Sequence, residues 1–390
     1  MKIAILGGCG AMGSITAKDL LSKASERVDK VIVADVDLKR GSQLTSELKD
    51  SRFEFQQLNI TDKEKTCELL KTVDACLNGL PTIAGYQMDI FNYCLETKCP
   101  YTDYGGLGIY TTEQKKLHQK FVERGVPAIL GLGEAPGLSN IMTKICAERL
   151  DKVKKISIIV AWKDMNPVSP VFVPPYSILT IMSEYVDTNV QYIDGKYKEM
   201  PAINGSLFID LPHPFGRYEV VHSRHSETAT VPISFKDKGI EEVTWRLNLG
   251  EELDNAMKVF VAAGFGDKEP LQIKGVEVPP VEFLEKLIQR NIQKNEEEII
   301  KRSYYEILFA IGEGEKGGKR TKITSRLASS PEQTSAGLTS ICASIGVQML
   351  AKGEIMPGTW APEECIDTEE FSKELKKRHF NMEVVTEEEM

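Results

Sequence analysis

The sequence predicts an α/β fold, in which a doubly wound parallel sheet carries an inserted α+β domain with a mostly antiparallel sheet. Three observations predict it. A short apolar run at 2–6 leads directly into the glycine-rich turn Gly7–Gly13. A second apolar run at 31–34 ends at Asp35, which lies 22 residues after Gly13. From residue 156 onward, strand-like runs follow one another without regular helices between them.

The first 35 residues have the order of the Rossmann dinucleotide-binding fingerprint: strand, glycine-rich turn, helix, strand and acidic residue. Gly8 allows a tight turn, Gly10 lets a pyrophosphate approach the backbone, and Gly13 lets the helix pack close to the strand. The N–H groups at the helix start, around Ala11 and Met12, would face the negative charge. We therefore predict a bound dinucleotide. The alternative is a βαβ unit whose glycines serve packing only.

Asp35 bears on which dinucleotide binds. Its carboxylate would accept hydrogen bonds from the adenosine ribose and would repel a 2′-phosphate, which favours NAD. Lys39 and Arg40 follow closely and could bind that phosphate instead, so NADP stays possible.

The rest of the first 150 residues alternates between strand-like and helix-like segments. We expect strands at 53–58, 74–81, 100–104 and 126–130, and helices at 63–72, 84–97, 111–124 and after Pro136. Together with the two strands at the start, these make six parallel strands with crossover helices.

Ligands of such sheets bind beyond the carboxyl ends of the strands, so residues there are candidates for cofactor contacts. Thr61 and Asp62 follow the third strand and would either contact the adenine or cap the next helix. Asn78, Gly79 and Leu80 leave the fourth strand. We expect them to pass close to the pyrophosphate and the nicotinamide ribose.

The middle of the chain reads as a separate domain. We expect strands at 156–162, 218–222, 228–234, 241–248, 304–311 and 319–327, and an amphipathic helix at 281–301. The stretch Gly312–Gly318 resembles a phosphate loop, but Gly318-Lys319 is followed by Arg320 rather than Ser or Thr. A hairpin is therefore predicted there. A helix rich in small residues at 331–352 is expected to pack closely and to return to the first domain.

Composition argues against several classes of function. The formal net charge is −9 and no basic block is present, so nucleic acid and an anionic membrane surface are not expected as partners. No run approaches the ~20 apolar residues of a membrane span, and residues 1–25 lack a signal-peptide pattern. The eight cysteines and five histidines form no metal-ligand pattern. We therefore expect a cytoplasmic protein with reduced thiols and no metal.

Several stretches resemble the saccharopine dehydrogenase superfamily and, within it, the lysine 6-dehydrogenase branch. They are Gly7–Gly13, Asn78–Pro81 with Gly85-Tyr86, Thr102–Gly106, Ala135–Ile141 and Leu350–Glu363. The resemblance covers about 1–150 and 335–390 and is coarse between them. It implies a discontinuous Rossmann domain at 1–138 and 335–390. It also implies a domain at 139–334 that binds substrate and builds a homodimer or a higher homo-oligomer.

The resemblance further implies a reaction. This is hydride transfer between a nicotinamide cofactor and a carbon that bears nitrogen, in an amino acid or amine, with an imine intermediate. One alternative is a condensing reductase that joins an amine to an aldehyde, as saccharopine- or carboxynorspermidine-forming relatives do. Another is a dinucleotide-binding sensor without catalysis. The substrate stays open, because Ala161–Asp164 and Trp245–Gly250 depart from the superfamily's pattern.

Oxidation of an amine, followed by hydrolysis of the imine, calls for a base with a pKa near neutrality. Asp103 ends the fifth strand and Glu134 lies in the loop after the sixth, so both are candidates for catalysis or for contact with the substrate. Asp103 could instead hold the following glycine turn, and Glu134 could cap the helix that begins at Pro136. His222 is a third candidate, because it matches a superfamily position.

Three more side chains are candidates for the substrate pocket. Arg224 could clamp a substrate carboxylate through a bidentate pair, or it could be a surface charge. Tyr86 and Tyr104 follow strands of the first domain and are candidates for pocket walls.

Overall fold

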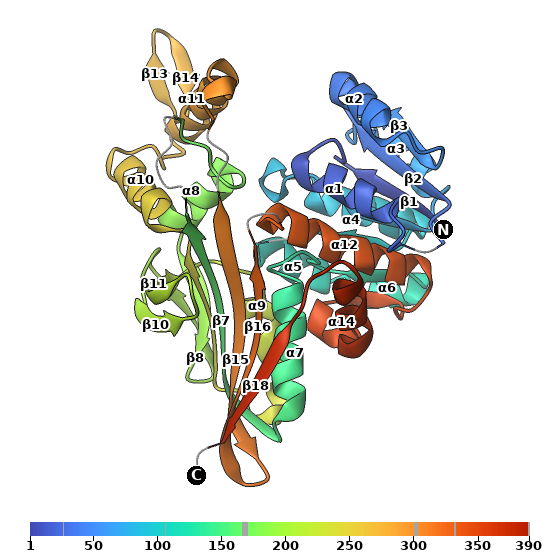
Figure 1. Ribbon diagram of the computed structural model, residues 1–390. Helices are drawn as coiled ribbons and strands as arrows, with labels where there is room; N and C mark the ends of the chain where they lie inside the picture. Colours follow the sequence, from blue (N-terminus) through green and yellow to red (C-terminus); the bar gives the residue numbers. More distant parts are fainter. Residues whose placement is uncertain (26, 106, 166–170, 300–302, 331–332, 389–390) are drawn as a thin grey trace.

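The computed structural model describes residues 1–25, 27–105, 107–165, 171–299, 303–330 and 333–388, which form two large sheets (Figure 1). The first sheet has seven strands in the order β17-β6-β5-β4-β1-β2-β3, and all its pairings are parallel. The strands are β1 (Lys2–Leu6), β2 (Lys30–Asp35), β3 (Phe53–Gln57), β4 (Ala75–Asn78), β5 (Tyr101–Asp103), β6 (Pro127–Ile129) and β17 (Gly358–Trp360). The six predicted parallel strands are confirmed, and β17 adds a seventh from the C-terminal segment.

Helices cover both faces of this sheet. They are α1 (Ala11–Leu20), α2 (Leu38–Leu48), α3 (Lys63–Leu70), α4 (Gln87–Thr97), α5 (Ile109–Lys115), α6 (His118–Arg124) and α12 (Ser335–Ala351). Alternate residues of β1 face opposite layers: Ile3 and Ile5 share a core with α1 and α12, whereas Ala4 and Leu6 share one with α4 and α6. The expected helix at 111–124 is divided in two. None of the described helices combines the length and the apolarity that crossing a membrane requires.

The small residues of α12 let it pack closely, as predicted. A Cβ added to Gly346 would lie 1.8 Å from Cδ2 of Leu132. The hydroxyl of Ser340 donates to the carbonyl oxygen of Met12 at 2.9 Å. This helix therefore lies against α1 and the first sheet (Figure 1). The predicted positions 331 and 332 lie outside the described residues.

The second sheet has nine strands, and its main path is β10-β11-β12-β7-β15-β16-β18. They are β7 (Lys152–Asp164), β8 (Asn189–Ile193), β9 (Lys196–Met200), β10 (Leu207–Leu211), β11 (Gly216–His222), β12 (Glu242–Asn248), β15 (Tyr304–Lys316), β16 (Lys319–Ser329) and β18 (Glu383–Glu388). All pairings are antiparallel except that of β7 with β12. The predicted hairpin around 312–318 is confirmed, since β15 and β16 pair up to Lys316 and Lys319.

The prediction of a strand at 228–234 was wrong, because this segment is the helix α9 (Glu227–Ser234). Its β-branched residues suggested a strand. However, Thr228, Thr230 and Val231 are buried, and α9 packs against β12 and against α7 (Leu138–Arg149). Tertiary packing thus overrides local propensity here.

Helices also lie between the strands of the second sheet. Two of them, α8 (Ile178–Val186) and α10 (Glu251–Ala262), were not expected, and neither was the small hairpin of β13 (Leu271–Ile273) and β14 (Val276–Val278). A third, α11 (Pro280–Lys294), is the predicted amphipathic helix. The helix expected at 281–301 therefore ends at Lys294, and positions 300 and 301 lie outside the described residues.

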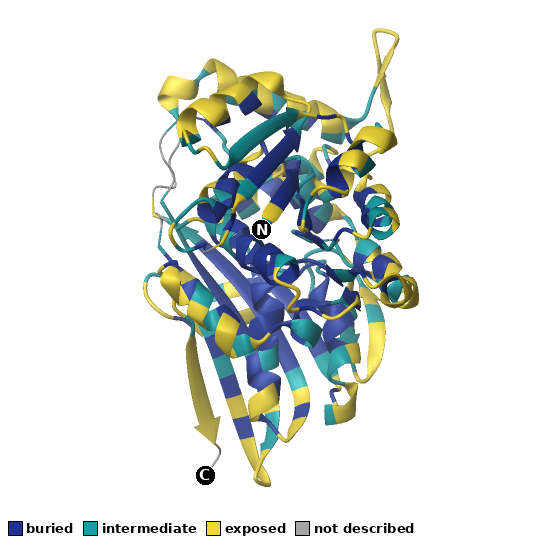
Figure 2. Ribbon diagram, turned by 90° about the vertical axis from the view of Figure 1, so that its right-hand side faces the viewer, coloured by how far each residue is buried: buried dark blue, intermediate teal, exposed yellow. Residues whose placement is uncertain are grey.

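The C-terminal segment contacts both sheets. Its helix α14 (Thr368–Lys377) packs on α12, whereas its last strand, β18, pairs with β16 of the second sheet. Figure 2 shows buried residues along both sheets and exposed residues along β18 and the outer helices. The domain boundaries predicted above stay a prediction.

A buried ion pair fixes α14 to α1. The side chains of Arg378 and Asp19 are 3% and 7% exposed, and Nε of Arg378 lies 2.9 Å from both carboxylate oxygens. We expect Arg378→Ala to lower the free energy of unfolding by about 3–5 kcal/mol, because it leaves the Asp19 carboxylate buried without its partner. Urea denaturation measures this. The matched control is Arg326→Ala, which breaks the exposed pair with Glu383 and should cost less than about 1 kcal/mol. Equal losses in the two variants would contradict the prediction.

Candidate active site

The glycine-rich turn has the shape that a pyrophosphate requires. A Cβ added to Gly13 would lie 2.5 Å from Cα of Gly8, so only glycine allows this helix–turn contact. Gly10 is exposed, and the nearest atom to a Cβ added there is 3.6 Å away. In the described structure no side chain caps α1, which leaves the N–H groups of its first turn, from Ala11 and Met12 onward, for an anion. The turn therefore fits a dinucleotide phosphate.

Asp35 is held beside this turn by backbone donors. Its Oδ2 accepts a hydrogen bond from the N–H of Cys9 at 3.0 Å, and its Oδ1 accepts one from the N–H of Asp37 at 3.1 Å. The carboxylate thus lies at the end of β2, next to the phosphate turn, where a ribose is expected. Arg40 lies 3.7 Å from the carboxylate of Glu47.

The other residues predicted to contact the cofactor divide into two groups. Asp62 caps α3 by accepting a hydrogen bond from the N–H of Lys65 at 3.2 Å, and Thr61 precedes it on the exposed surface. These contacts match the capping alternative.

The loop after β4 instead lies against the phosphate turn. Oδ1 of Asn78 accepts from the N–H of Leu80 at 3.2 Å. A Cβ added to Gly79 would lie 2.9 Å from the carbonyl oxygen of Leu6, at the end of β1. A Cβ added to Gly7 would lie 2.8 Å from the side chain of Leu80. This loop therefore forms one wall of the predicted cofactor site.

Asp103 is buried, and four donors surround its carboxylate. Oδ2 accepts from Nε2 of Gln87 at 2.6 Å, from the hydroxyl of Tyr101 at 2.7 Å and from Nε2 of Gln114 at 3.1 Å. Oδ1 accepts from the N–H of Gly131 at 2.8 Å. Burial raises the pKa of Asp103, and these donors oppose that rise. These contacts favour the role in which Asp103 positions the loop after β6 over a role in catalysis.

Glu134 lies in that loop and is 4% exposed. Its Oε2 accepts a hydrogen bond from the hydroxyl of Ser335 at 2.6 Å, and Ser335 begins α12. Its carboxyl group lies within hydrogen-bonding reach of that of Glu306, on β15 of the second sheet. Glu134 therefore stands where the two sheets meet.

Glu306 is also 4% exposed, and its Oε1 accepts a hydrogen bond from the indole N–H of Trp162 on β7. Burial raises the pKa of Glu134 to about 7. Burial also raises the pKa of Glu306, and the nearby charge of Glu134 raises it further. A base with a pKa near neutrality is what proton transfer at physiological pH requires.

A layer of ionisable side chains surrounds this pair. The imidazole of His225 stacks on Trp245 with ring centroids 3.9 Å apart, and it pairs with Glu227. Burial raises the pKa of Glu184 to about 7, and the hydroxyl of Tyr176 donates to this carboxyl at 2.7 Å. The charge of His225 lowers the pKa of both Glu134 and Glu184. A positive charge on His225 therefore favours the ionised forms of both carboxyl groups.

His222 and Arg224 have other contacts. Nδ1 of His222 lies 3.2 Å from Oδ1 of Asn204. Burial and the charge of Arg246 lower the pKa of His222 to about 4, so its ring is neutral at pH 7. Arg224 forms an ion pair with Asp187 at 3.3 Å. These contacts favour structural roles over the roles predicted from the sequence.

Tyr104 and Tyr86, the two candidates for pocket walls, differ in their contacts and in their exposure. The hydroxyl of Tyr104 lies 2.7 Å from Oγ1 of Thr16 on α1, so its ring lies behind the cofactor turn. Tyr86 stands at the start of α4 and is 37% exposed, which leaves it open to a ligand.

Sequence reasoning missed Glu306, Ser335, Trp162 and His225. Glu306 had a visible signal, because it is an acidic residue inside an otherwise apolar strand. His225 had none, because its segment was expected to lead into a strand. Ser335 and Trp162 are ordinary residues of a helix start and a strand, and only the fold brings them to a carboxyl group.

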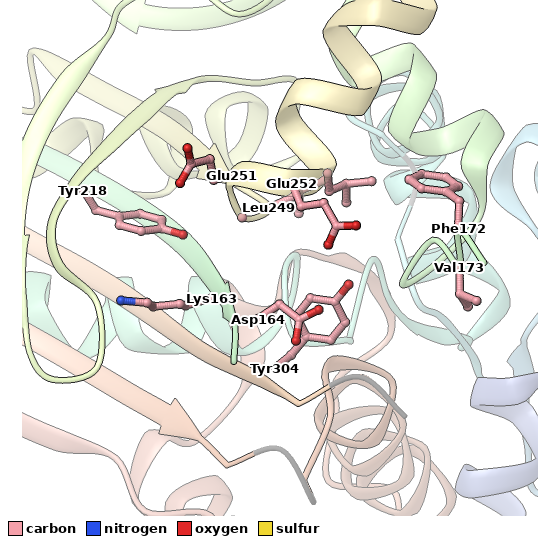
Figure 3. Close-up of a pocket in the computed structure, with 11 residues that line it drawn as sticks. Lys163, Asp164, Phe172, Val173, Tyr218, Leu249, Glu251, Glu252 and Tyr304 are labelled. Atoms are coloured by element: carbon pink, nitrogen blue, oxygen red, sulfur yellow. The ribbon is translucent and has the colours of Figure 1, made fainter. Parts of the chain in front are cut away.

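A cavity of about 300 Å³ lies at the end of β7 and the start of β15 (Figure 3). Its wall includes the aromatic rings of Phe172, Tyr218 and Tyr304 and the charged side chains of Lys163, Asp164, Glu251 and Glu252. Tyr304 pairs with Asp164 across β15 and β7, and Glu306 pairs with Trp162 two residues further along. Because side chains two residues apart on a strand share a face, Tyr304 and Asp164 place one wall of the cavity on the face that carries Glu306, whereas Lys163 belongs to the opposite face.

Known proteins resemble the whole chain. Residues 3–129 match the saccharopine dehydrogenase NADP binding domain, and residues 133–380 match the saccharopine dehydrogenase C-terminal domain. The structure resembles that of apo saccharopine dehydrogenase (L-Glu forming) from Saccharomyces cerevisiae. That likeness has a TM-score of 0.74 and 13% identity and covers 99% of this chain and 100% of that one, so it shows the fold.

The curated relatives are more similar to this chain in sequence than that structure, but the similarity covers only part of each protein. A carboxynorspermidine synthase from Vibrio alginolyticus is 24% identical over 295 residues, which cover 71% of this chain and 66% of the relative. A carboxyaminopropylagmatine dehydrogenase from Synechocystis is 20% identical over 300 residues, or 74% of this chain and 72% of the relative. Since the two domain matches together extend over most of its length, the chain belongs to the saccharopine dehydrogenase family.

Proposed function

We propose that the protein is an NAD(P)-dependent oxidoreductase that acts on a C–N bond of an amino acid or amine. The observation that carries this proposal is Glu134, a buried carboxyl group with a pKa of about 7. It lies at the carboxyl edge of the sheet whose first turn fits a pyrophosphate. A bound nicotinamide cofactor supplies or accepts the hydride in this chemistry. Family membership and the names of the relatives support the same class of reaction.

Glu134, Asp103 and the cavity have separate roles in this reaction. Glu134 accepts a proton from the substrate ammonium, since only a neutral amine is oxidised, and it returns that proton in the opposite direction. Asp103 holds the loop that carries Glu134, through Gly131. The cavity beside β7 and β15 binds the rest of the substrate. Its lining carries both signs of charge and aromatic walls, which suits a molecule with amine, carboxylate and methylene groups.

A second candidate is a condensing reductase, which joins an amine to an aldehyde and reduces the resulting imine. The names of the relatives favour it, because a carboxynorspermidine synthase forms a larger amine. We expect the same residues to act, with Glu134 delivering a proton to the imine nitrogen. The resemblance to lysine 6-dehydrogenase favours simple dehydrogenation instead. A homodimer and a cytoplasmic location are also proposals that rest on resemblance and composition.

One assay separates these candidates. The absorbance of reduced nicotinamide is followed with NAD or NADP and a panel of diamines and basic amino acids, lysine included. Reduction of NAD or NADP when a single amine is supplied identifies a dehydrogenase. Oxidation of NADH or NADPH that needs both an amine and an aldehyde identifies the condensing reductase. Tight cofactor binding without either signal would contradict the proposed function and favour a sensor.

The preference between NAD and NADP can be tested at Asp35. We expect Asp35→Asn to raise the ratio of NADP to NAD affinity by about tenfold or more. The variant removes a charge that would stand within about 4 Å of a 2′-phosphate, while it keeps an acceptor oxygen. Fluorescence titration of both cofactors measures the ratio. Asp37→Asn is the matched control, because Asp37 caps α2 through the N–H of Arg40 and should leave the ratio unchanged. An unchanged ratio in Asp35→Asn would show that Lys39 or Arg40 sets the preference.

A further inference from the structure

We propose that Glu306 is a positioning residue of this site, which carries the proton of a two-carboxyl pair and donates it in a hydrogen bond to Glu134. This inference rests on the proposed function, because it gives Glu134 its protonation state before the reaction. It assigns a role to a residue of the second sheet that no sequence motif marks.

The hydrogen bonds of the pair leave room for one shared proton. Ser335 donates to Oε2 of Glu134, and Trp162 donates to Oε1 of Glu306. The other two oxygens, Oε1 of Glu134 and Oε2 of Glu306, are buried, and no donor among the described residues reaches them. Two buried carboxyl groups within hydrogen-bonding reach cannot both ionise without a large cost, so a proton between them is the favourable state.

The surroundings decide which carboxyl group carries this proton. The charge of His225 favours ionisation of Glu134. The negative charge of Glu134 instead disfavours ionisation of Glu306. Cys342 also faces the pair, and its pKa is raised by burial first and by the charge of Glu134 next. The pKa of Tyr176 is raised by burial first and by Glu184 next, and the charge of Glu306 adds to this rise. Glu306 therefore holds the proton, and Glu134 is the carboxylate.

The Glu134–Glu306 pair therefore holds a defined number of protons at each stage of the reaction. Before amine oxidation the pair holds one proton. Glu134 then takes the proton that leaves the substrate ammonium, so the pair holds two, and the C–H electron pair leaves as hydride to the oxidised cofactor. Reduction of an imine runs in the opposite sense, with the second proton returning to nitrogen.

The test compares two variants of Glu306 through the pH dependence of kcat/KM. In the native protein we expect kcat/KM to rise with pH through about 7, because the carboxylate of Glu134 is the active form. Glu306→Leu removes the donor to that carboxylate and should move the midpoint upward by about one to two pH units. Glu306→Gln supplies an amide donor in the same place and should keep the midpoint near its native position.

The matched control is Glu363→Gln. Burial raises the pKa of Glu363 to about 7 as well, but this residue bonds to Asn140 and Ser234, outside the pair. This variant should leave the midpoint unchanged. An unchanged midpoint in Glu306→Leu would overturn the proposal, and so would an equal shift in Glu306→Leu and Glu306→Gln.

Infrared difference spectroscopy gives a readout that needs no turnover. The native protein should show a protonated carboxyl band at pH 8 that is missing in Glu306→Gln and present in Glu363→Gln at the same pH. If that band is present but no substrate pair gives turnover, the proposed function fails while the proton pair stands. If turnover occurs and the band of Glu306 is absent, the pair fails while the function stands.

Discussion

Glu134→Gln is expected to lower kcat by about 10²–10⁴-fold, the usual contribution of a general base. The amide keeps the size of the side chain and can still accept a hydrogen bond from Ser335, but it cannot take a proton from the substrate. Affinity for the dinucleotide should stay within about twofold of the native value, because the phosphate turn is untouched. Single-turnover absorbance with saturating substrate measures the loss.

The control for this variant is again Glu363→Gln, which replaces an equally buried glutamate. It should keep native turnover. A native rate in Glu134→Gln would contradict the role of Glu134. Loss of both rate and dinucleotide binding would show damage to the fold instead.

Gly13→Ala is expected to weaken dinucleotide binding by about 100-fold and to destabilise the protein. The new Cβ would lie 2.5 Å from Cα of Gly8, so α1 must move away from the turn. Overpacking of this kind costs about 1–3 kcal/mol, and each 1.4 kcal/mol of lost binding energy corresponds to about tenfold in affinity. Isothermal titration with NAD and NADP, together with urea denaturation, measures both effects.

Gly10→Ala separates packing from ligand contact. A Cβ at this position would lie no closer than 3.6 Å to its nearest neighbour, the carbonyl oxygen of Gly7, and the free protein should therefore keep its stability. Affinity should still fall, because the methyl group would stand where the pyrophosphate approaches the backbone. Equal affinity in Gly10→Ala and the native protein would contradict the assignment of the turn to the phosphate.

The parallel sheet could be predicted because its signals are local. The turn after β1 has glycines at required positions, and each strand is a short apolar run that is followed by a helix. The second sheet was harder, because propensity gives the wrong answer where packing decides. The segment 228–234 has the residues of a strand, yet its contacts with α7 and β12 make it a helix. The strand β17 of the first sheet was not predicted, because this three-residue strand lies in the C-terminal segment, far from the alternating strands and helices that mark the other six.

The same contrast applies to the site. Asp35, Asn78 and Glu134 could be chosen from the sequence, because strand ends in a parallel sheet lie at one edge. The pairing of Glu134 with Glu306 could not, since these residues are 172 positions apart and belong to different sheets. His222 was chosen from a family position, whereas His225, which stacks on Trp245, is the histidine whose charge lowers the pKa of Glu134 and Glu184. Such contacts depend on how strands pair, which no local pattern encodes.

The most direct test of the proposed chemistry follows the hydride itself. The protein is supplied with reduced cofactor carrying deuterium at C4 of the nicotinamide, together with the amine and aldehyde that give turnover, and the product is analysed by mass spectrometry and NMR. If the protein acts on a C–N bond, one deuterium will appear on the carbon bonded to nitrogen. Deuterium on an alcohol carbon, or a product with none, would contradict the proposal.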